Sequence, residues 1–231
     1  MTGHTLPPLR STNEWPAPGG VWSYDTWGRH GRPVLLLPAV LFDRVSWWPV
    51  AADLRPHATV IAVDLPGHGG SDARLRYDPY ELVDDLAALI ADVGVPQAPI
   101  VVGHGTTAGL AALFASQYAV HAVVTVDADT DIPSEHHSYV HGMCLATVPA
   151  HYRDLVHAAD NPDLLRAYSQ CITVRTAPPP AAFKHARLAI HSQPPPSAEP
   201  DDGRLAVYHV PGRFAHLADT DRFVRDLTSL L

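Results

Sequence analysis

Short apolar runs alternate with longer stretches in which apolar residues recur every three or four positions. Several runs are apolar throughout, which is typical of parallel strands buried on both faces. The predicted strands are residues 21–27, 33–37, 59–64, 99–102, 122–127, 187–190 and 205–209. The predicted helices of this pattern are residues 47–54, 79–93, 110–118 and 219–231. This alternation predicts an α/β fold, with a mostly parallel central sheet flanked by helices.

The alternation stops after Ile132 and resumes near residue 187. Between these points, residues 138–145, 150–158 and 162–174 have the periodicity of short helices, and three prolines at 178–180 end the last one. We therefore predict one α/β core built from residues 1–132 and 183–231. A helical cap, residues 133–182, is predicted as an insertion into that core.

Length and charge limit the class of protein. A chain of 231 residues suits one domain with a sizeable core, and its formal net charge of −8 repels a polyphosphate backbone. Nucleic acid is therefore not an expected partner. No apolar run is long enough for a membrane span, the first residues do not resemble a secretory signal, and Cys144 and Cys171 are too few for a disulfide framework. The expected location is the cytoplasm, with two reduced thiols and no membrane partner.

Four segments, taken in order, carry a resemblance to a known family. They are PVLLLPAVLFDRVSWWPVAADL from residue 33, VIAVDLPGHGGSD from residue 60, PIVVGHGTTAG from residue 99 and VPGRFAHLADTDRF from residue 210. Together they resemble the α/β-hydrolase family, over most of residues 20–231. The resemblance implies the α/β-hydrolase fold, with a short helical lid over a largely apolar cavity at the strand ends.

The third segment corresponds to the nucleophile elbow of that family, Gly-x-Ser-x-Gly, which lifts a serine above the sheet. Gly103 and His104 fit the motif, but Gly105 stands where the serine is expected and Thr107 where the second glycine is expected. Glycine tolerates the strained turn but has no atom with which to attack. Thr106 occupies the next position, whose backbone N–H contributes to the family's oxyanion hole. The resemblance therefore implies a hydrolase fold without its serine nucleophile.

The acid and the base of the family are also altered. No carboxylate follows the penultimate strand until Glu199, so the alternative acid position, at the end of the strand after the elbow, makes Asp127 or Asp129 the candidate. Counting back from the final helix puts Arg213 at the family's histidine position and His216 three residues later. The sequence leaves open which of the two occupies the site, and His216 is a candidate base.

The oxyanion loop departs from the family as well. Members commonly carry His-Gly after the first buried strand, whereas this chain has Pro38-Ala39. Proline has no backbone N–H, so any donor must come from Val40 or beyond. Val40 and Leu41 are therefore candidate substrate-binding residues, together with Gly105, Thr106 and Arg213.

Several candidates also have a purely structural interpretation. His104 is a candidate catalytic residue, but its position before the elbow favours a buried histidine in the sheet packing. Trp47 either lines the ligand pocket or packs its helix onto the core. Asp64 and His68 are expected to hold a turn.

The histidines of the predicted cap raise the question of a metal site. His136, His137 and His141 do not show the spacing of a metal centre, so no metal is expected. The glycine-rich segments lack the dinucleotide-binding pattern, so no organic cofactor is expected either.

Three functions remain open. The first is a non-hydrolytic enzyme that performs proton transfer, cyclisation, elimination or epimerisation on a small, largely apolar metabolite, with Asp127 or His216 as the base. Lys184 is the only lysine, a composition that suggests a GC-rich bacterial source, and a biosynthetic pathway is the expected setting for this first function. The second is an unconventional hydrolase that activates water directly. The third is a non-catalytic protein that binds a ligand or a partner.

Overall fold

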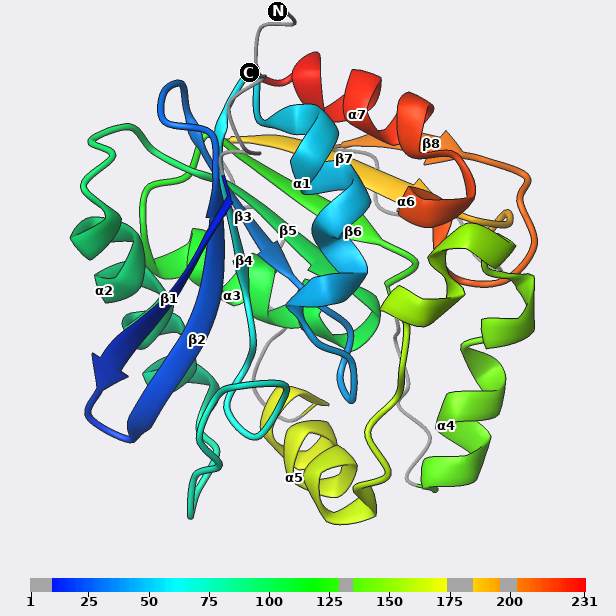
Figure 1. Ribbon diagram of the computed structural model, residues 1–231, viewed down its shortest axis with the longest axis horizontal. Coiled ribbons are helices and arrows are strands. Elements are labelled where there is room, and N and C mark those ends of the chain that lie inside the picture. The colour runs from blue at the N-terminus through cyan, green and yellow to red at the C-terminus, as the bar shows by residue number, and fades with distance from the viewer. Residues whose placement is uncertain (1–9, 129–134, 174–184, 196–202) are drawn as a thin grey trace, which may run out of the picture.

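The protein is built around one eight-stranded sheet (Figure 1). The computed structural model describes residues 10–128, 135–173, 185–195 and 203–231. Its strands lie in the order β1-β2-β4-β3-β5-β6-β7-β8; β3 to β8 are parallel to one another, and β1 and β2 are antiparallel to their neighbours. The strands are β1 (Arg10–Ala17), β2 (Gly20–Trp27), β3 (Pro33–Leu37), β4 (Thr59–Val63), β5 (Ile100–His104), β6 (Ala122–Val126), β7 (Ala186–His191) and β8 (Arg204–Val207). The predicted fold class is confirmed.

Helices cover both faces of this sheet. One face carries α2 (Pro79–Val93) and α3 (Ala108–Gln117), and the other carries α1 (Trp48–Leu54) and α7 (Thr220–Thr228), preceded by the short α6 (Ala215–Ala218) (Figure 1). Two short 3-10 turns lead into helices on opposite faces: η1 (Arg44–Trp47) into α1 and η2 (Gly105–Thr107) into α3. The helix boundaries follow local signals, as at α2, where Asp78 accepts the hydrogen bond of the Tyr80 N–H and Gly94 ends the helix at φ 79°.

The central strands separate two hydrophobic cores. In β3, Val34 and Leu36 belong to the core under α1 and α7, whereas Leu35 and Leu37 belong to the core under α2 and α3. All four side chains are fully buried. Burial on both faces explains why these strands are continuously apolar in the sequence.

Between β6 and β7, the chain forms helices that lie beyond the carboxyl ends of the parallel strands (Figure 1). They are α4 (His136–Gly142), η3 (Leu145–Thr147), η4 (Ala150–Leu155) and α5 (Pro162–Thr173). We call these helices and the segments that connect them the cap. The Ala159 N–H, in the cap, donates to the Leu41 carbonyl across 2.8 Å. The prolines at 178–180, the candidate acid Asp129 and Glu199 lie outside the described residues.

Strand β1 was not among the predicted elements. Its sequence, RSTNEWPA, is mostly polar and lacks an apolar run, because the strand lies at the edge of the sheet and is largely exposed. It pairs with β2 in a hairpin from Arg10 opposite Trp27 to Ala17 opposite Gly20. Among the described helices, none has the length and apolar character needed to cross a bilayer.

Candidate functional site

Three adjacent strands bring their carboxyl ends together. Leu37 pairs with Gly103 across β3 and β5, and Gly103 pairs with Thr125 across β5 and β6. The loops that follow these strands therefore leave the sheet side by side. Parallel α/β sheets bind ligands at this edge.

Each of these three loops contains a residue with a positive backbone φ. The angle is 71° at Leu41 after β3, 59° at Gly105 after β5 and 45° at Asp127 after β6. For leucine and aspartate this conformation costs on the order of 1–3 kcal/mol, and such strain clusters at functional sites. The carboxyl edge therefore holds strained residues in two loops and, in the third, a glycine that adopts this conformation without strain.

The turn at Gly105 is a sharp change from strand to helix. Gly103 allows it, because a Cβ on this residue would lie 2.5 Å from the Thr107 carbonyl oxygen and 2.7 Å from Ala108 Cα. The Thr107 hydroxyl fixes the turn: it accepts the His104 N–H at 3.0 Å and lies 3.0 Å from the His104 carbonyl and 3.3 Å from that of Leu37. Thr107, where a glycine was expected, thus stabilises the elbow rather than disrupting it.

Beneath the turn lies a cluster of aromatic rings around two histidines. The His104 and His216 rings have centroids 4.9 Å apart, and Trp47 lies against His216 at 4.1 Å. All three side chains are fully buried. Burial lowers the pKa of His104 to about 4 and that of His216 well below its ordinary value, with the His104 charge adding to the effect on His216. Both imidazoles are therefore neutral at neutral pH.

The sequence predicted His216 as a candidate base at the strand ends. In the structure, its side chain does not extend toward them. It packs between Trp47 and Phe223, with ring centroids 4.1 and 5.9 Å away, and its ring also lies against the Ser46 main chain. The three-residue offset from Arg213 carries it into the first turn of α6, whose buried side turns toward the core. This placement disfavours His216 as a base.

Arg213 lies at the sheet edge instead. Its Nη2 donates to the Asp127 carbonyl at 2.5 Å, and its own carbonyl lies 2.7 Å from His104 Nε2. The side chain of Arg213 is half-buried. The structure therefore brings Arg213, Asp127 and His104 together, and the hydrogen bond of His104 supports its structural interpretation.

The Asp127 carboxylate has a partner that sequence reasoning missed. Its Oδ1 accepts the Ser192 N–H at 2.6 Å and its Oδ2 accepts the Ser192 hydroxyl at 2.7 Å. Ser192 follows β7, next to β6 in the sheet, and is itself buried. The parallel order of β6 and β7 was the only sequence signal that could have paired these two residues.

The loop after β3 contains the two predicted main-chain donors. Val40 and Leu41 are buried, and the loop turns back on itself through a 3.0 Å hydrogen bond from the Phe42 N–H to the Ala39 carbonyl. The Leu41 N–H donates to His68 Nε2 at 2.9 Å. Val40 and Thr106 therefore remain the candidate oxyanion donors, whereas the Leu41 N–H is engaged.

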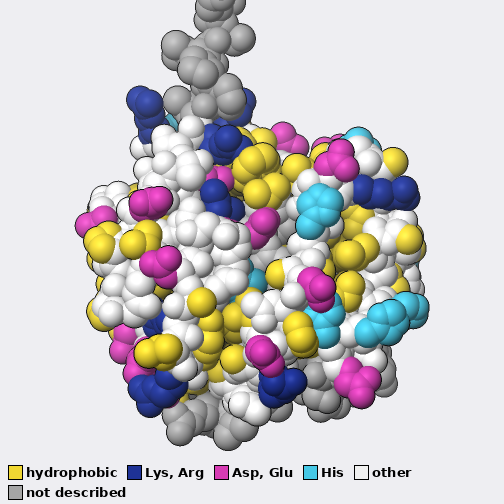
Figure 2. All heavy atoms as spheres, turned by 60° about the horizontal axis from the view of Figure 1, so that its bottom comes forward, with side chains coloured by type: hydrophobic (Ala, Val, Ile, Leu, Met, Phe, Trp, Pro, Cys, Tyr) yellow, Lys and Arg dark blue, Asp and Glu magenta, His cyan; other side chains and the backbone are white. Residues whose placement is uncertain are grey.

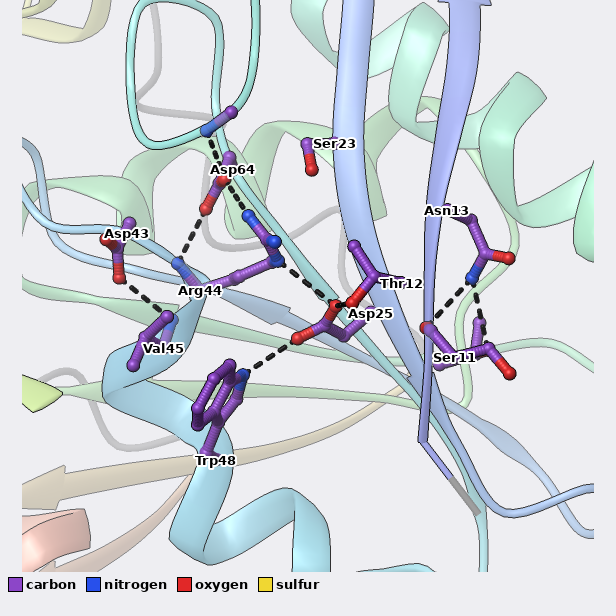
Figure 3. A network of polar contacts seen from close by, with 12 residues as sticks. Ser11, Thr12, Asn13, Ser23, Asp25, Asp43, Arg44, Val45, Trp48 and Asp64 are labelled. Carbon is purple, nitrogen blue, oxygen red and sulfur yellow. Dashed lines mark hydrogen bonds and ion pairs between the residues drawn. The ribbon is translucent and has the colours of Figure 1, made fainter. Parts of the chain in front are cut away.

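A buried ionic network anchors the far end of this loop (Figure 3). The Arg44 guanidinium lies between two fully buried carboxylates: its Nε is 3.2 Å from Asp25 Oδ1, and its Nη1 contacts Asp64. Asp64 also accepts the N–H groups of Arg44 and Gly70, and Asp25 accepts the Trp48 indole N–H. Asp64 thus holds a turn, as predicted.

The cap forms the surface of the protein beyond the candidate site. Figure 2 shows histidine side chains gathered on the side where α4 lies, with apolar patches broken up by charged residues. A cavity of about 720 Å³ opens between α5 and residues 73–79, with Tyr77, Leu164 and Cys171 in its wall. The predicted site residues do not line this cavity. Among the described residues, no three His, Cys, Asp or Glu side chains gather as a metal site would require.

Known proteins resemble this chain in structure but not closely in sequence. A search of curated proteins gives no match. Among solved structures, the enol-lactonase from Burkholderia xenovorans LB400 has a TM-score of 0.74 at 17% identity, covering 94% of this chain and 99% of that one. The Cif epoxide hydrolase from Acinetobacter nosocomialis has a TM-score of 0.76 at 14% identity, covering 98% of this chain and 90% of that one. E-2-(acetamidomethylene)succinate hydrolase has a TM-score of 0.78 at 16% identity, covering 96% of this chain and 98% of that one.

These structural similarities, at low identity, support the fold. A sequence model of the alpha/beta hydrolase fold family matches residues 32–163, more than half of the chain. The matched region contains the loops of Leu41, Gly105 and Asp127, and ends before Arg213. This chain belongs to the α/β-hydrolase fold family.

Proposed function

We propose that this protein is an α/β-hydrolase-fold enzyme that acts on a small, largely apolar metabolite without a serine nucleophile. The main support for this proposal is Gly105, which has φ 59° in the turn directly after β5, where the family holds its nucleophilic serine. Glycine offers no atom that attacks a carbonyl carbon. A covalent acyl intermediate therefore cannot form at this position.

The second support is Arg213, the one of the two candidates for the family's histidine position that lies at the sheet edge. A guanidinium has N–H donors and no acceptor atom, so Arg213 cannot accept a proton from a nucleophile or from water. A permanent cation at the sheet edge instead binds a carboxylate or stabilises an enolate. We infer that the metabolite carries, or develops, a negative charge near Arg213.

Asp127 is the proposed base. It combines a carboxylate at the end of a central parallel strand with a strained φ of 45°, the kind of outlier that functional sites retain. Ser192 fixes its orientation, and the main-chain N–H groups of Val40 and Thr106 are the proposed donors to a developing oxyanion. These groups suit isomerisation, cyclisation, elimination or epimerisation, reactions of the kind found in bacterial biosynthetic pathways.

One observation favours a second candidate, a non-catalytic protein that binds the same class of ligand. Both oxygens of the Asp127 carboxylate already accept hydrogen bonds from Ser192, so neither oxygen receives a substrate proton unless one of these bonds is given up. In the unconventional hydrolase, a carboxylate or a histidine would activate water; the burial of His216 among aromatic rings disfavours this histidine and leaves Asp127 as the candidate.

The first test uses a fluorophosphonate probe and a panel of activated esters. The natural protein and a Gly105→Ser variant are both expected to remain unlabelled, because the serine of the variant lacks a base. A Gly105→Ser, Arg213→His double variant should gain labelling at position 105. Labelling of a serine in the natural protein, or saturable ester hydrolysis, would overturn the proposal.

A second test separates the enzyme from the binder. Metabolites that raise the melting temperature of the protein are incubated with it and analysed for change by mass spectrometry. An enzyme converts one of them, and Asp127→Asn abolishes the conversion while keeping the thermal shift. Binding of every such metabolite without conversion would favour the second candidate.

A further inference from the structure

The strained conformation of Leu41 is held from two sides. Its N–H donates to His68 Nε2 at 2.9 Å, and its carbonyl accepts the Ala159 N–H of the cap at 2.8 Å. Leu41 has φ 71°, a conformation unfavourable for leucine, so the surrounding contacts must maintain it. The two peptide groups that flank Leu41 are thus held, one by the core and the other by the cap.

His68 is arranged as an acceptor for this N–H. Its Nδ1 lies 3.3 and 3.2 Å from the carbonyls of Leu65 and Pro66, which accept but cannot donate, so Nδ1 carries the proton. The other nitrogen is then free of hydrogen and accepts. Burial lowers the pKa of His68 to about 4, so the ring keeps this neutral form at neutral pH.

The cap also holds His68 in place. Tyr168 of α5 packs edge-on against the His68 ring, with centroids 5.1 Å apart, and its hydroxyl donates to the Pro66 carbonyl at 2.9 Å. Both rings are buried. The imidazole is therefore fixed by its own turn, by α5 and by Leu41.

We propose that His68 is the positioning residue of the ligand site: it accepts the Leu41 N–H, holds Leu41 in its left-handed conformation and so sets the direction of the neighbouring Val40 main chain. Since β3 and β5 pair at Leu37 and Gly103, Val40 lies in the loop beside the Gly105 turn. This inference rests on the proposed function, in which the Val40 N–H serves as a donor. It extends the role of His68 beyond holding its own turn.

The N–H···N hydrogen bond can be detected directly in the natural protein by nuclear magnetic resonance. With uniform ¹⁵N labelling, we expect a scalar coupling across the bond between the Leu41 amide nitrogen and His68 Nε2. The His68 spectrum should show the tautomer protonated at Nδ1. A His68 ring protonated at Nε2, without the coupling, would overturn the proposal.

Two variants test the consequence. His68→Phe keeps an aromatic ring against Tyr168 but has no acceptor, so hydrogen exchange of the Leu41 amide should accelerate by up to about tenfold. The Tyr208 amide, which bonds to the His191 carbonyl at the far side of the sheet, should be unchanged. His68→Gln restores an acceptor oxygen and should recover much of the protection.

Unchanged Leu41 exchange in His68→Phe would show that His68 does not hold the loop. If His68→Phe loses protection at every amide, the coupling in the natural protein decides. No ligand enters these measurements, so their failure leaves the probe and metabolite assays to judge the proposed function separately. Conversely, a natural protein that labels with fluorophosphonate would refute the proposed function while the coupling persists.

Discussion

The imidazole of His216 stacks on the indole of Trp47, with ring centroids 4.1 Å apart and ring planes inclined by 31°. In a working hydrolase, a histidine near the end of the chain moves protons at the strand ends. Here His216, the histidine nearest to Arg213 in the sequence, is a buried packing element that also lies against the Ser46 main chain. The pair is therefore placed to contribute to the packing of the core.

Acid should destabilise the fold between pH 6.5 and 4. The folded-state pKa values of His68 and His104 are about 4, and that of His216 lies well below the ordinary 6.5, so the unfolded chain binds protons first. The stability that these neutral rings contribute is fully present above pH 6.5 and declines as the pH falls. The upper limit is about 1.4 kcal/mol per pH unit for each histidine.

Urea unfolding at pH 7, 5.5 and 4.5 measures this loss. His216→Phe keeps a ring against Trp47 but cannot take up a proton, so the pH dependence should become shallower. His137→Phe, on an exposed histidine of α4, serves as the control and should leave the slope unchanged. A free energy of unfolding that stays constant from pH 7 to 4.5 would contradict the prediction.

Removal of Arg44 should destabilise the protein strongly. Arg44→Met leaves Asp25 and Asp64 fully buried without their cation, a change that typically costs about 3–5 kcal/mol. The matched control is Arg76→Met, which breaks the exposed ion pair with Glu81 and should cost less than about 1 kcal/mol. Equal urea midpoints for the two variants would show that the buried network adds nothing.

Thr107 should matter more to stability than a comparable hydroxyl elsewhere. Thr107→Val removes the acceptor of the His104 N–H in a fully buried turn, with an expected loss of about 1–3 kcal/mol. Thr228→Val removes a half-buried hydroxyl that donates to a helix carbonyl and should cost less than about 1 kcal/mol. Urea unfolding of both variants tests the difference, which a similar loss in each would refute.

Arg213 should confer a preference for negatively charged ligands. Small aryl carboxylates, such as cinnamate and 3-phenylpropionate, are expected to raise the melting temperature, because a ligand that binds only the folded state stabilises it. The corresponding neutral amides and the Arg213→Gln variant should show a much smaller shift. If the variant responds to the carboxylates as strongly as the natural protein, the ligand anion does not bind at Arg213.

The fold could be predicted from the sequence because its central strands are buried on both faces. The runs at β3, β4 and β5 are continuously apolar, and α2 begins at Asp78 and Pro79 with clear start signals. Strand β1 escaped prediction because an exposed edge needs no apolar pattern. Its only evidence in the sequence was its proximity to β2.

The candidate site was predicted only in part. Asp127, Gly105 and Arg213 follow from their places relative to strands and the final helix, and the structure brings Asp127 and Arg213 into contact. The bond from Ser192 to Asp127, and the one from Leu41 to His68, join residues 65 and 27 positions apart. Such pairings depend on three-dimensional packing, which the spacing of residues along one chain does not reveal.

The shape of the elbow has a consequence for what a point mutation can do at this position. Gly103, Ala108 and Thr107 maintain the turn, so residue 105 inherits its left-handed backbone from its neighbours. Two glycine codons differ from two serine codons by a single base, so point mutation can readily supply a hydroxyl here. A hydroxyl alone does not supply the proton transfer of a serine hydrolase, because Arg213, more than a hundred residues further along the chain, would have to become a histidine as well. The step that limits conversion to a serine esterase is therefore the change in the loop before α6, and not the change in the elbow.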